Sequence, residues 1–128
     1  MSRNSRVRRH LPVTIWSLLT AALLLTPGDE LPDPGLWDWL DKPLHTLLFA
    51  IHCGLLMRAL GESGERGRGL AAAVLVSALY ALLLETMQMW IPERSWEWWD
   101  LAADFAGIAV VALLGGRPRA RLRASSRG

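Results

Sequence analysis

The sequence has very little of several residue types that commonly carry chemistry. Its 128 residues include one cysteine, Cys53, and three histidines. A single cysteine cannot form a disulfide within the chain, and it disfavours a metal–thiolate cluster. No H-E-x-x-H motif is present, which argues against the common metalloprotease arrangement.

Charged residues are scarce within four apolar blocks, which span 11–26, 44–60, 70–90 and 101–114. At 1.5 Å per residue, the block 70–90 is about 30 Å long, the thickness of a bilayer core. The first and last blocks are short for a span. We therefore predict an all-α fold, a four-helix transmembrane bundle in residues 11–116, with the lipid bilayer as its main partner.

Short basic segments flank this membrane domain. We expect residues 1–10 to form a disordered tail and residues 117–128 to form a second basic tail. The N-terminal segment also resembles a signal peptide, because a basic stretch precedes an apolar one. No small-x-small cleavage site follows it, which favours an uncleaved helix.

The charges between the blocks are strongly asymmetric. If the helices alternate in direction, twelve of the 14 basic residues lie on one side: Arg3, Arg6, Arg8, Arg9, Arg58, Arg66, Arg68, Arg117, Arg119, Arg121, Arg123 and Arg127. The other side keeps Lys42 and Arg94. Basic residues remain in the cytoplasm, which predicts a multi-pass inner-membrane protein with both termini cytoplasmic. The basic residues thus set the topology, and we expect no nucleic-acid binding from a net charge of +2.

Helix boundaries are predicted from capping residues, proline and tryptophan. Asp41 is placed to cap the second helix, with Pro43 in its first turn, and the third helix is expected to end at Pro92. The fourth helix is expected from about 98 to 115. Six tryptophans fall at the outer ends of the blocks, where their amphipathic rings suit the headgroup layer: Trp37, Trp39, Trp90, Trp96, Trp98 and Trp99.

Ionisable residues of three predicted helices reach the same depth, just beneath the outer surface, and Lys42 and Arg94 are expected at the rim above them. This candidate site comprises Asp41, Lys42, His45, Glu85, Gln88, Arg94, Asp100 and Asp104. A charge at a helix centre costs about 2.5–3.5 kcal/mol on insertion scales, so such groups need partners.

Simpler structural roles compete with a shared site. Asp41 and Asp100 are also typical helix N-caps. Lys42 and Arg94 are also typical of residues that extend to the membrane surface. We interpret His52 as a hydrogen-bonded packing residue. Glu85 lies too far inside an apolar block for any of these roles, so it favours the shared site.

Four short motifs support a family resemblance. D-K-P-L-H with Phe49 behind it, E-T-M-Q, P-E-R-S and D-L-A-A-D-F-A-G occur in this order within residues 41–107. In these motifs the chain resembles the VanZ-like family of small bacterial membrane proteins. The resemblance implies that the family's motif residues here are Asp41, Lys42, His45, Glu85, Gln88, Pro92, Arg94, Asp100 and Gly107. Asp104 departs from the pattern, since asparagine is usual there, and it adds a negative charge.

The resemblance implies a fold and a location more than an activity. The family is named for a member associated with low-level resistance to the glycopeptide teicoplanin, and no biochemical mechanism is established for it. It therefore implies a cell-envelope protein with a link to antibiotic resistance.

Three hypotheses for function follow. The first is a non-enzymatic envelope protein that binds an anionic lipid or cell-wall precursor through Lys42, Arg94 and His45. The second is an intramembrane enzyme with Glu85 or His45 as general base. The third is a structural polar network that binds no ligand. The first is favoured; we expect no cofactor and no metal, with His45, Glu85 and Asp104 as weak candidates for metal ligands. The oligomeric state is left open.

The predicted topology can be tested by thiol labelling. We expect a cysteine at position 95, placed in a Cys53→Ser background, to react with a membrane-impermeant reagent on intact cells. A cysteine at position 63 should react only after the membrane is permeabilised. Labelling of position 63 but not position 95 on intact cells would reverse the topology.

Overall fold

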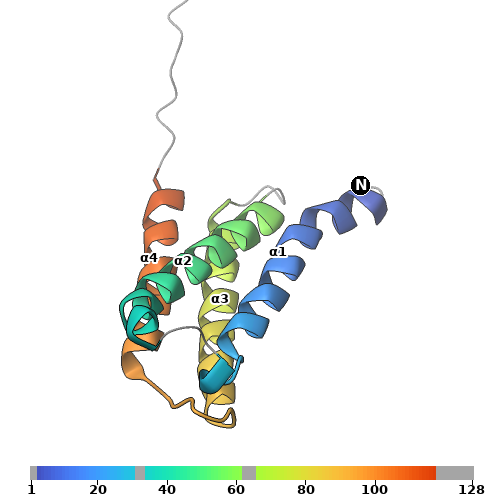
Figure 1. Cartoon of the computed structure of the whole chain (residues 1–128). Coiled ribbons are helices and arrows are strands. Elements are labelled where there is room, and N and C mark those ends of the chain that lie inside the picture. Colours follow the sequence, from blue (N-terminus) through green and yellow to red (C-terminus); the bar gives the residue numbers. More distant parts are fainter. Residues whose placement is uncertain (1–2, 31–33, 62–65, 118–128) are drawn as a thin grey trace, which may run out of the picture.

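The computed structural model describes residues 3–30, 34–61 and 66–117 and is all-helical in these ranges (Figure 1). The elements are α1 (Arg3–Leu24), a 3-10 helix η1 (Gly28–Glu30), α2 (Pro34–Leu60), α3 (Arg66–Gln88) and α4 (Trp98–Gly115). None of the described residues forms a strand, so the predicted all-α, four-helix fold is confirmed. The tail beyond residue 117 lies outside the described residues.

Three of the four helices are long and apolar enough to cross a membrane. The candidate spans are Asp38–Leu60, Gly67–Gln88 and Trp98–Gly115. Helix α1 is 22 residues long, but Arg6, Arg8 and Arg9 lie in its first half, and its apolar part begins only at Leu11. The chain is thus a membrane protein in which α1 is the least apolar helix.

Several predicted boundaries were wrong. Residues 3–10 belong to α1 rather than to a disordered tail, because arginine favours helix and no glycine or proline interrupts them. Helix α2 begins at Pro34, a residue type well suited to the first position of a helix, so Asp41 and Pro43 lie inside α2. Asp41 is therefore not an N-cap.

The α3–α4 connection also differs from the prediction at one end. Helix α3 ends at Gln88, four residues before Pro92. Helix α4 begins at Trp98 and ends at Gly115, as predicted. Its N-cap is Glu97, and Asp100 lies in the first turn, so the alternative role of Asp100 as an N-cap is excluded.

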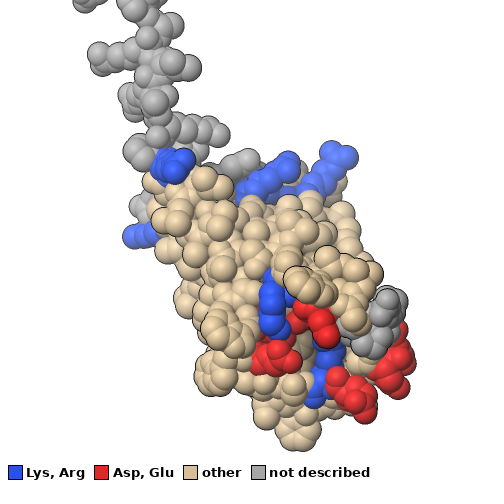
Figure 2. Space-filling model, turned by 60° about the vertical axis from the view of Figure 1, so that its left-hand side comes forward, with Lys and Arg blue, Asp and Glu red and all other residues tan. Residues whose placement is uncertain are grey.

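Charge separates the two ends of the bundle. The start of α1 and the end of α4 lie at one end, and α1 and α3 finish at the other, where α2 and α4 begin (Figure 1). We call the first the basic end; it carries Arg6, Arg8, Arg9, Arg58, Arg68 and Arg117. We call the second the acidic end; it carries Asp29, Glu30, Asp38, Glu93 and Glu97. Figure 2 shows a wide uncharged band between them.

The tryptophans divide into exposed and packed groups. Trp39, Trp90, Trp98 and Trp99 are exposed. Trp96 is half-buried and meets Trp98 edge to face. Trp16, the one tryptophan outside the predicted outer belt, donates a hydrogen bond from Nε1 to the Leu48 carbonyl at 3.0 Å and so ties α1 to α2.

Helix α2 is the centre of the bundle, because α1, α3 and α4 all pack on it. His45, Phe49 and His52 form its buried stripe. The prediction of His52 as a packing residue is confirmed: its two ring nitrogens lie 3.0 and 3.1 Å from the hydroxyls of Ser77 and Ser17. These bonds join α1, α2 and α3 in the middle of the bundle.

Helices α2 and α4 approach most closely at Gly107. A Cβ atom there would overlap the Thr46 carbonyl oxygen and lie 3.0 Å from the Ala50 nitrogen. Nearby, the Thr46 hydroxyl donates to the Ala103 carbonyl at 3.0 Å. Small residues allow such close packing in membranes, where no hydrophobic force drives helices together. Gly107 therefore sets the spacing of α2 and α4 one turn from Asp104.

The close approach predicts a specific cost for a single methyl group. Gly107→Ala should lower the free energy of unfolding in detergent by about 1–3 kcal/mol, because the new Cβ meets backbone atoms that cannot rotate away. Gly54→Ala in α2 is the matched control, since nothing lies within 4 Å of its added Cβ. Equal stability of the two variants would show that the crossing is looser than described.

Candidate functional site

The candidate site lies at the acidic end, between α2, α3 and α4. Helix α2 supplies Asp41, Lys42 and His45; α4 supplies Asp100 and Asp104; and α3 supplies Glu85. Asp41 and His45, like Asp100 and Asp104, are four residues apart and therefore share one helix face. His45, Glu85, Asp100 and Asp104 are all buried.

A hydrogen bond between His45 and Asp104 lies at the bottom of the site. The Nδ1 atom of His45 is 2.8 Å from Oδ1 of Asp104, and both side chains are at most 1% exposed. An ionised carboxylate can only accept, so Nδ1 carries the proton and donates it. This assigns the tautomer of a neutral His45 and leaves Nε2 with a free lone pair.

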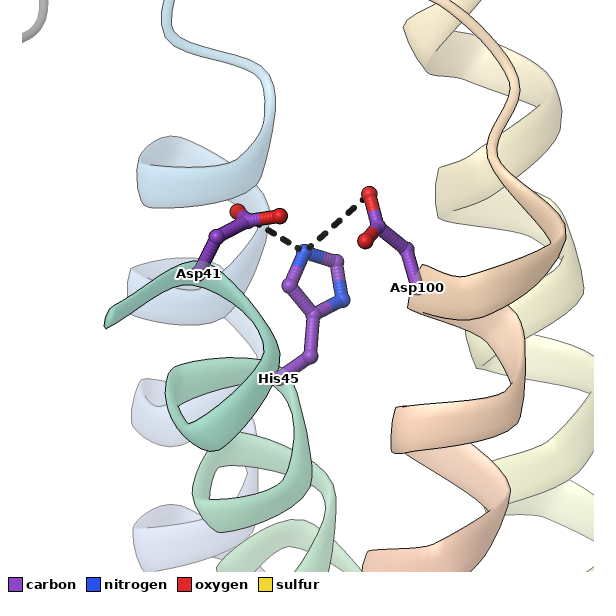
Figure 3. A group of neighbouring side chains, drawn as sticks. All are labelled: Asp41, His45 and Asp100. Carbon is purple, nitrogen blue, oxygen red and sulfur yellow. Dashed lines mark ion pairs between the residues drawn. The ribbon is translucent and has the colours of Figure 1, made fainter. Parts of the chain in front are cut away.

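The other ring nitrogen has no hydrogen-bond partner. Nε2 of His45 is buried and points between two carboxylates (Figure 3). It lies 3.8 Å from Oδ1 of Asp41 and 3.9 Å from Oδ2 of Asp100, which is too far for a hydrogen bond. A buried polar atom without a partner is unusual in a native fold.

Lys42 lies above this space and is 39% exposed. Its ammonium contacts Asp100 and lies 2.9 Å from Oδ2 of Asp41 and 2.9 Å from Oε2 of Glu97. Asp41 and Asp100 thus each turn one oxygen toward Lys42 and the other toward Nε2 of His45.

Glu85 lies beside the His45–Asp104 pair. It is 1% exposed, and the Glu97 backbone N–H donates to its Oε2 at 3.4 Å. Carboxylate oxygens of Glu85 and Asp104 and a ring nitrogen of His45 all lie within 4.8 Å of one another. A single water molecule can bridge such distances.

Gln88 and Arg94 donate hydrogen bonds to backbone carbonyls near the end of α1. Gln88 donates from Nε2 to the Leu24 carbonyl at 2.9 Å, and Arg94 donates from Nε to the Thr26 carbonyl at 3.1 Å. The last carbonyls of a helix have no partner within it, so Gln88 completes the end of α1 at Leu24, and Arg94 holds the turn two residues beyond it. The structure therefore gives both residues a role in anchoring α1.

Glu97 is a member of this group that sequence reasoning did not assign to the site. It reaches Lys42 through its side chain and Glu85 through its backbone N–H. In the sequence it lies in an irregular loop 55 residues from Lys42, where neither periodicity nor spacing indicates the pairing.

The formal charges of the site are unbalanced. The site contains one ammonium, that of Lys42, and five carboxylates: those of Asp41, Glu85, Glu97, Asp100 and Asp104. With a neutral His45 this amounts to a formal charge of −4, and a buried charge without compensation is costly. The arrangement is suited to holding a proton or a cation, and less suited to holding a bare anion.

A small bundle with apolar helices and buried ionisable groups at one end defines a multi-pass membrane protein with a polar site. A family model described as VanZ/LLP1 matches residues 4–116, most of the chain. The chain therefore belongs to the VanZ/LLP1 family, as the motifs indicated. No curated protein and no solved structure matches it.

Proposed function

We propose that this membrane protein binds the anionic headgroup of a lipid or a lipid-linked cell-wall precursor at its acidic end. The observation that carries the proposal is a shallow, open groove on the surface between α2 and α4. It is lined by Lys42, Thr46, Leu47, Ala50, Gly107 and Val110. Most of these side chains are apolar, and the groove ends at Lys42 beside the polar site.

A groove of this composition suits an acyl or isoprenoid chain. Leu47 and Val110 are 55% and 50% exposed and offer apolar contacts along its length. A lipid tail lying there brings its headgroup to the level of Lys42, Asp41 and Asp100. The ligand is thus amphipathic, with its apolar part along α2 and α4 and its phosphate or carboxylate at the site.

The headgroup needs more positive charge than Lys42 offers. Three carboxylates already surround the ammonium of Lys42, and Arg94 is turned to the Thr26 carbonyl. A phosphate placed at this site without another cation meets net negative charge. Binding of an anion here therefore requires a counter-charge that comes with the ligand or precedes it.

The separation of charge between the two ends supports a location in the bacterial inner membrane. With the basic end in the cytoplasm, as the positive-inside rule requires, the polar site opens toward the cell envelope. There it meets the headgroups of outer-leaflet lipids and of cell-wall precursors. A link to teicoplanin resistance follows if such precursors are the ligands, because glycopeptides act at that surface.

A second candidate function is acid–base catalysis on the same ligand. The His45–Asp104 hydrogen bond favours it, since a buried carboxylate that orients an imidazole leaves Nε2 free to take a proton. Conversion of the bound lipid over time would support catalysis. Recovery of unchanged lipid would support binding alone.

The groove can be blocked by one substitution. We expect Leu47→Trp to lower the amount of phosphatidylglycerol retained in native mass spectrometry by about fivefold, the effect of losing ~1 kcal/mol of binding free energy. Leu79→Trp on α3 is the matched control, because Leu79 and Leu47 are similarly exposed, at 57% and 55%. Equal retention by both variants would contradict a lipid site in this groove.

A further inference from the structure

We propose that Asp41, His45 and Asp100 bind a divalent transition-metal ion, with Zn²⁺ as the ion that fits the ligands best. Nε2 of His45 and one oxygen from each aspartate would be its protein ligands. The proposed metal site depends only on the geometry of these three residues. Its role as the counter-charge for an anionic headgroup rests on the proposed function.

The first argument is the unpartnered nitrogen. Nε2 of His45 is fully buried, has no hydrogen-bond partner and points into the space between the two carboxylates (Figure 3). Its other ring nitrogen, Nδ1, is bonded to Asp104, so a neutral His45 presents a lone pair at Nε2. Neutral imidazole with a free Nε2 is the commonest protein ligand for transition metals.

The second argument is the distance between the potential ligands. Zn²⁺ binds nitrogen and oxygen at about 2.0–2.2 Å, so two ligands of a tetrahedral ion are about 3.4 Å apart. The separations of 3.8 and 3.9 Å from Nε2 to Asp41 and Asp100 are slightly wider. Small side-chain rotations would bring all three atoms to an ion placed between them.

The third argument is the surroundings of the three ligands. Metal-binding histidines commonly donate their second ring N–H to a carboxylate, which fixes the ring and raises its basicity. Asp104 is the carboxylate that accepts this hydrogen bond from His45. Lys42 holds the outer oxygens of Asp41 and Asp100. The inner oxygens are thereby directed toward Nε2 before any ion binds.

The charge of the site favours a cation independently. A divalent ion would halve the formal charge of −4 carried by the five carboxylates and Lys42. A membrane-buried site gains from such neutralisation because it has little water to screen the charges. Imidazole favours zinc and related ions over Mg²⁺ or Ca²⁺, which prefer oxygen ligands alone.

The sequence predicted no metal and offered a different set, which shares only His45, as weak candidates. His45, Glu85 and Asp104 also lie close enough to share an ion. In that group, however, the histidine nitrogen facing Asp104 is already used in a 2.8 Å hydrogen bond. An ion held by Asp41, His45 and Asp100 would use the nitrogen that has no other partner. It would also keep at least one open coordination position, which a headgroup phosphate oxygen can occupy.

Equilibrium dialysis of the purified chain against ZnSO4 in detergent, with metal quantified by mass spectrometry, tests the site. We expect one Zn²⁺ per chain, and Asp41→Asn should weaken its binding by about tenfold or more. Asp38→Asn is the matched control, since Asp38 is an exposed carboxylate in the same helix. No saturable Zn²⁺ binding to the native chain overturns the proposal, as does equal weakening by both substitutions.

A second measurement covers the case in which Asp41→Asn does not fold. Co²⁺ should bind the native chain and give visible absorption bands typical of four-coordinate nitrogen and oxygen ligation. Zn²⁺ should displace it. Absence of Co²⁺ bands together with stoichiometric Zn²⁺ would place the ion away from His45 and overturn the assignment.

A lipid-retention experiment distinguishes this inference from the proposed function. Phosphatidylglycerol retention should fall when EDTA removes the metal and return when Zn²⁺ is restored. If EDTA does not change lipid retention, the groove is supported, but the proposal that the metal is the counter-charge for the headgroup is overturned. Saturable Zn²⁺ binding without any lipid retention leaves the metal site in place and overturns the proposed function.

Discussion

The hydrogen bond between Nδ1 of His45 and Asp104 is the interaction on which the acidic end of the bundle depends. It joins α2 to α4 where both side chains are buried, so neither has water as an alternative partner. Within a membrane, an unpaired carboxylate at this depth would be costly. The same bond fixes the ring of His45, and with it the direction of Nε2 toward Asp41 and Asp100.

Close packing makes that bond feasible. Gly107 lets the backbones of α2 and α4 approach, and the Thr46–Ala103 hydrogen bond holds the same crossing. Helix α1 is attached by other hydrogen bonds. Gln88 donates to the last carbonyl of α1 and Arg94 to the Thr26 carbonyl just beyond it, and the Gly28 backbone N–H donates to the Pro92 carbonyl at 3.3 Å. The polar residues of this small bundle therefore serve both the site and the attachment of α1.

The sequence predicted the architecture because apolar length and charge separation are properties of long segments. Four helices, the hydrogen-bonded packing role of His52, and the α4 boundaries are all confirmed. Local capping signals were less reliable. Asp41 lies deep in a helix that starts at Pro34, since a proline at the first helical position outweighs an aspartate seven residues later.

The sequence predicted which helical side chains come close together at the acidic end, but not how they pair. Periodicity and depth bring Asp41, His45, Glu85, Asp100 and Asp104 together, because helix geometry fixes them along the axis. Neither signal reveals which side chain turns toward which. Gln88 and Arg94 were predicted members of the site, yet they donate to the Leu24 carbonyl at the end of α1 and to the Thr26 carbonyl just beyond it. Glu97 joins Lys42 from an irregular loop, where no periodicity exists to reveal it.

A double-mutant cycle on His45 and Asp104 tests the central claim most directly. Unfolding of His45→Ala, Asp104→Ala and the double variant would be measured in detergent beside the native chain. A direct buried pair predicts a coupling free energy of about 1–3 kcal/mol, because the second substitution removes an interaction that the first has already lost. Additive losses, within about 0.5 kcal/mol, would show that the two side chains do not form the bond that organises this end of the bundle.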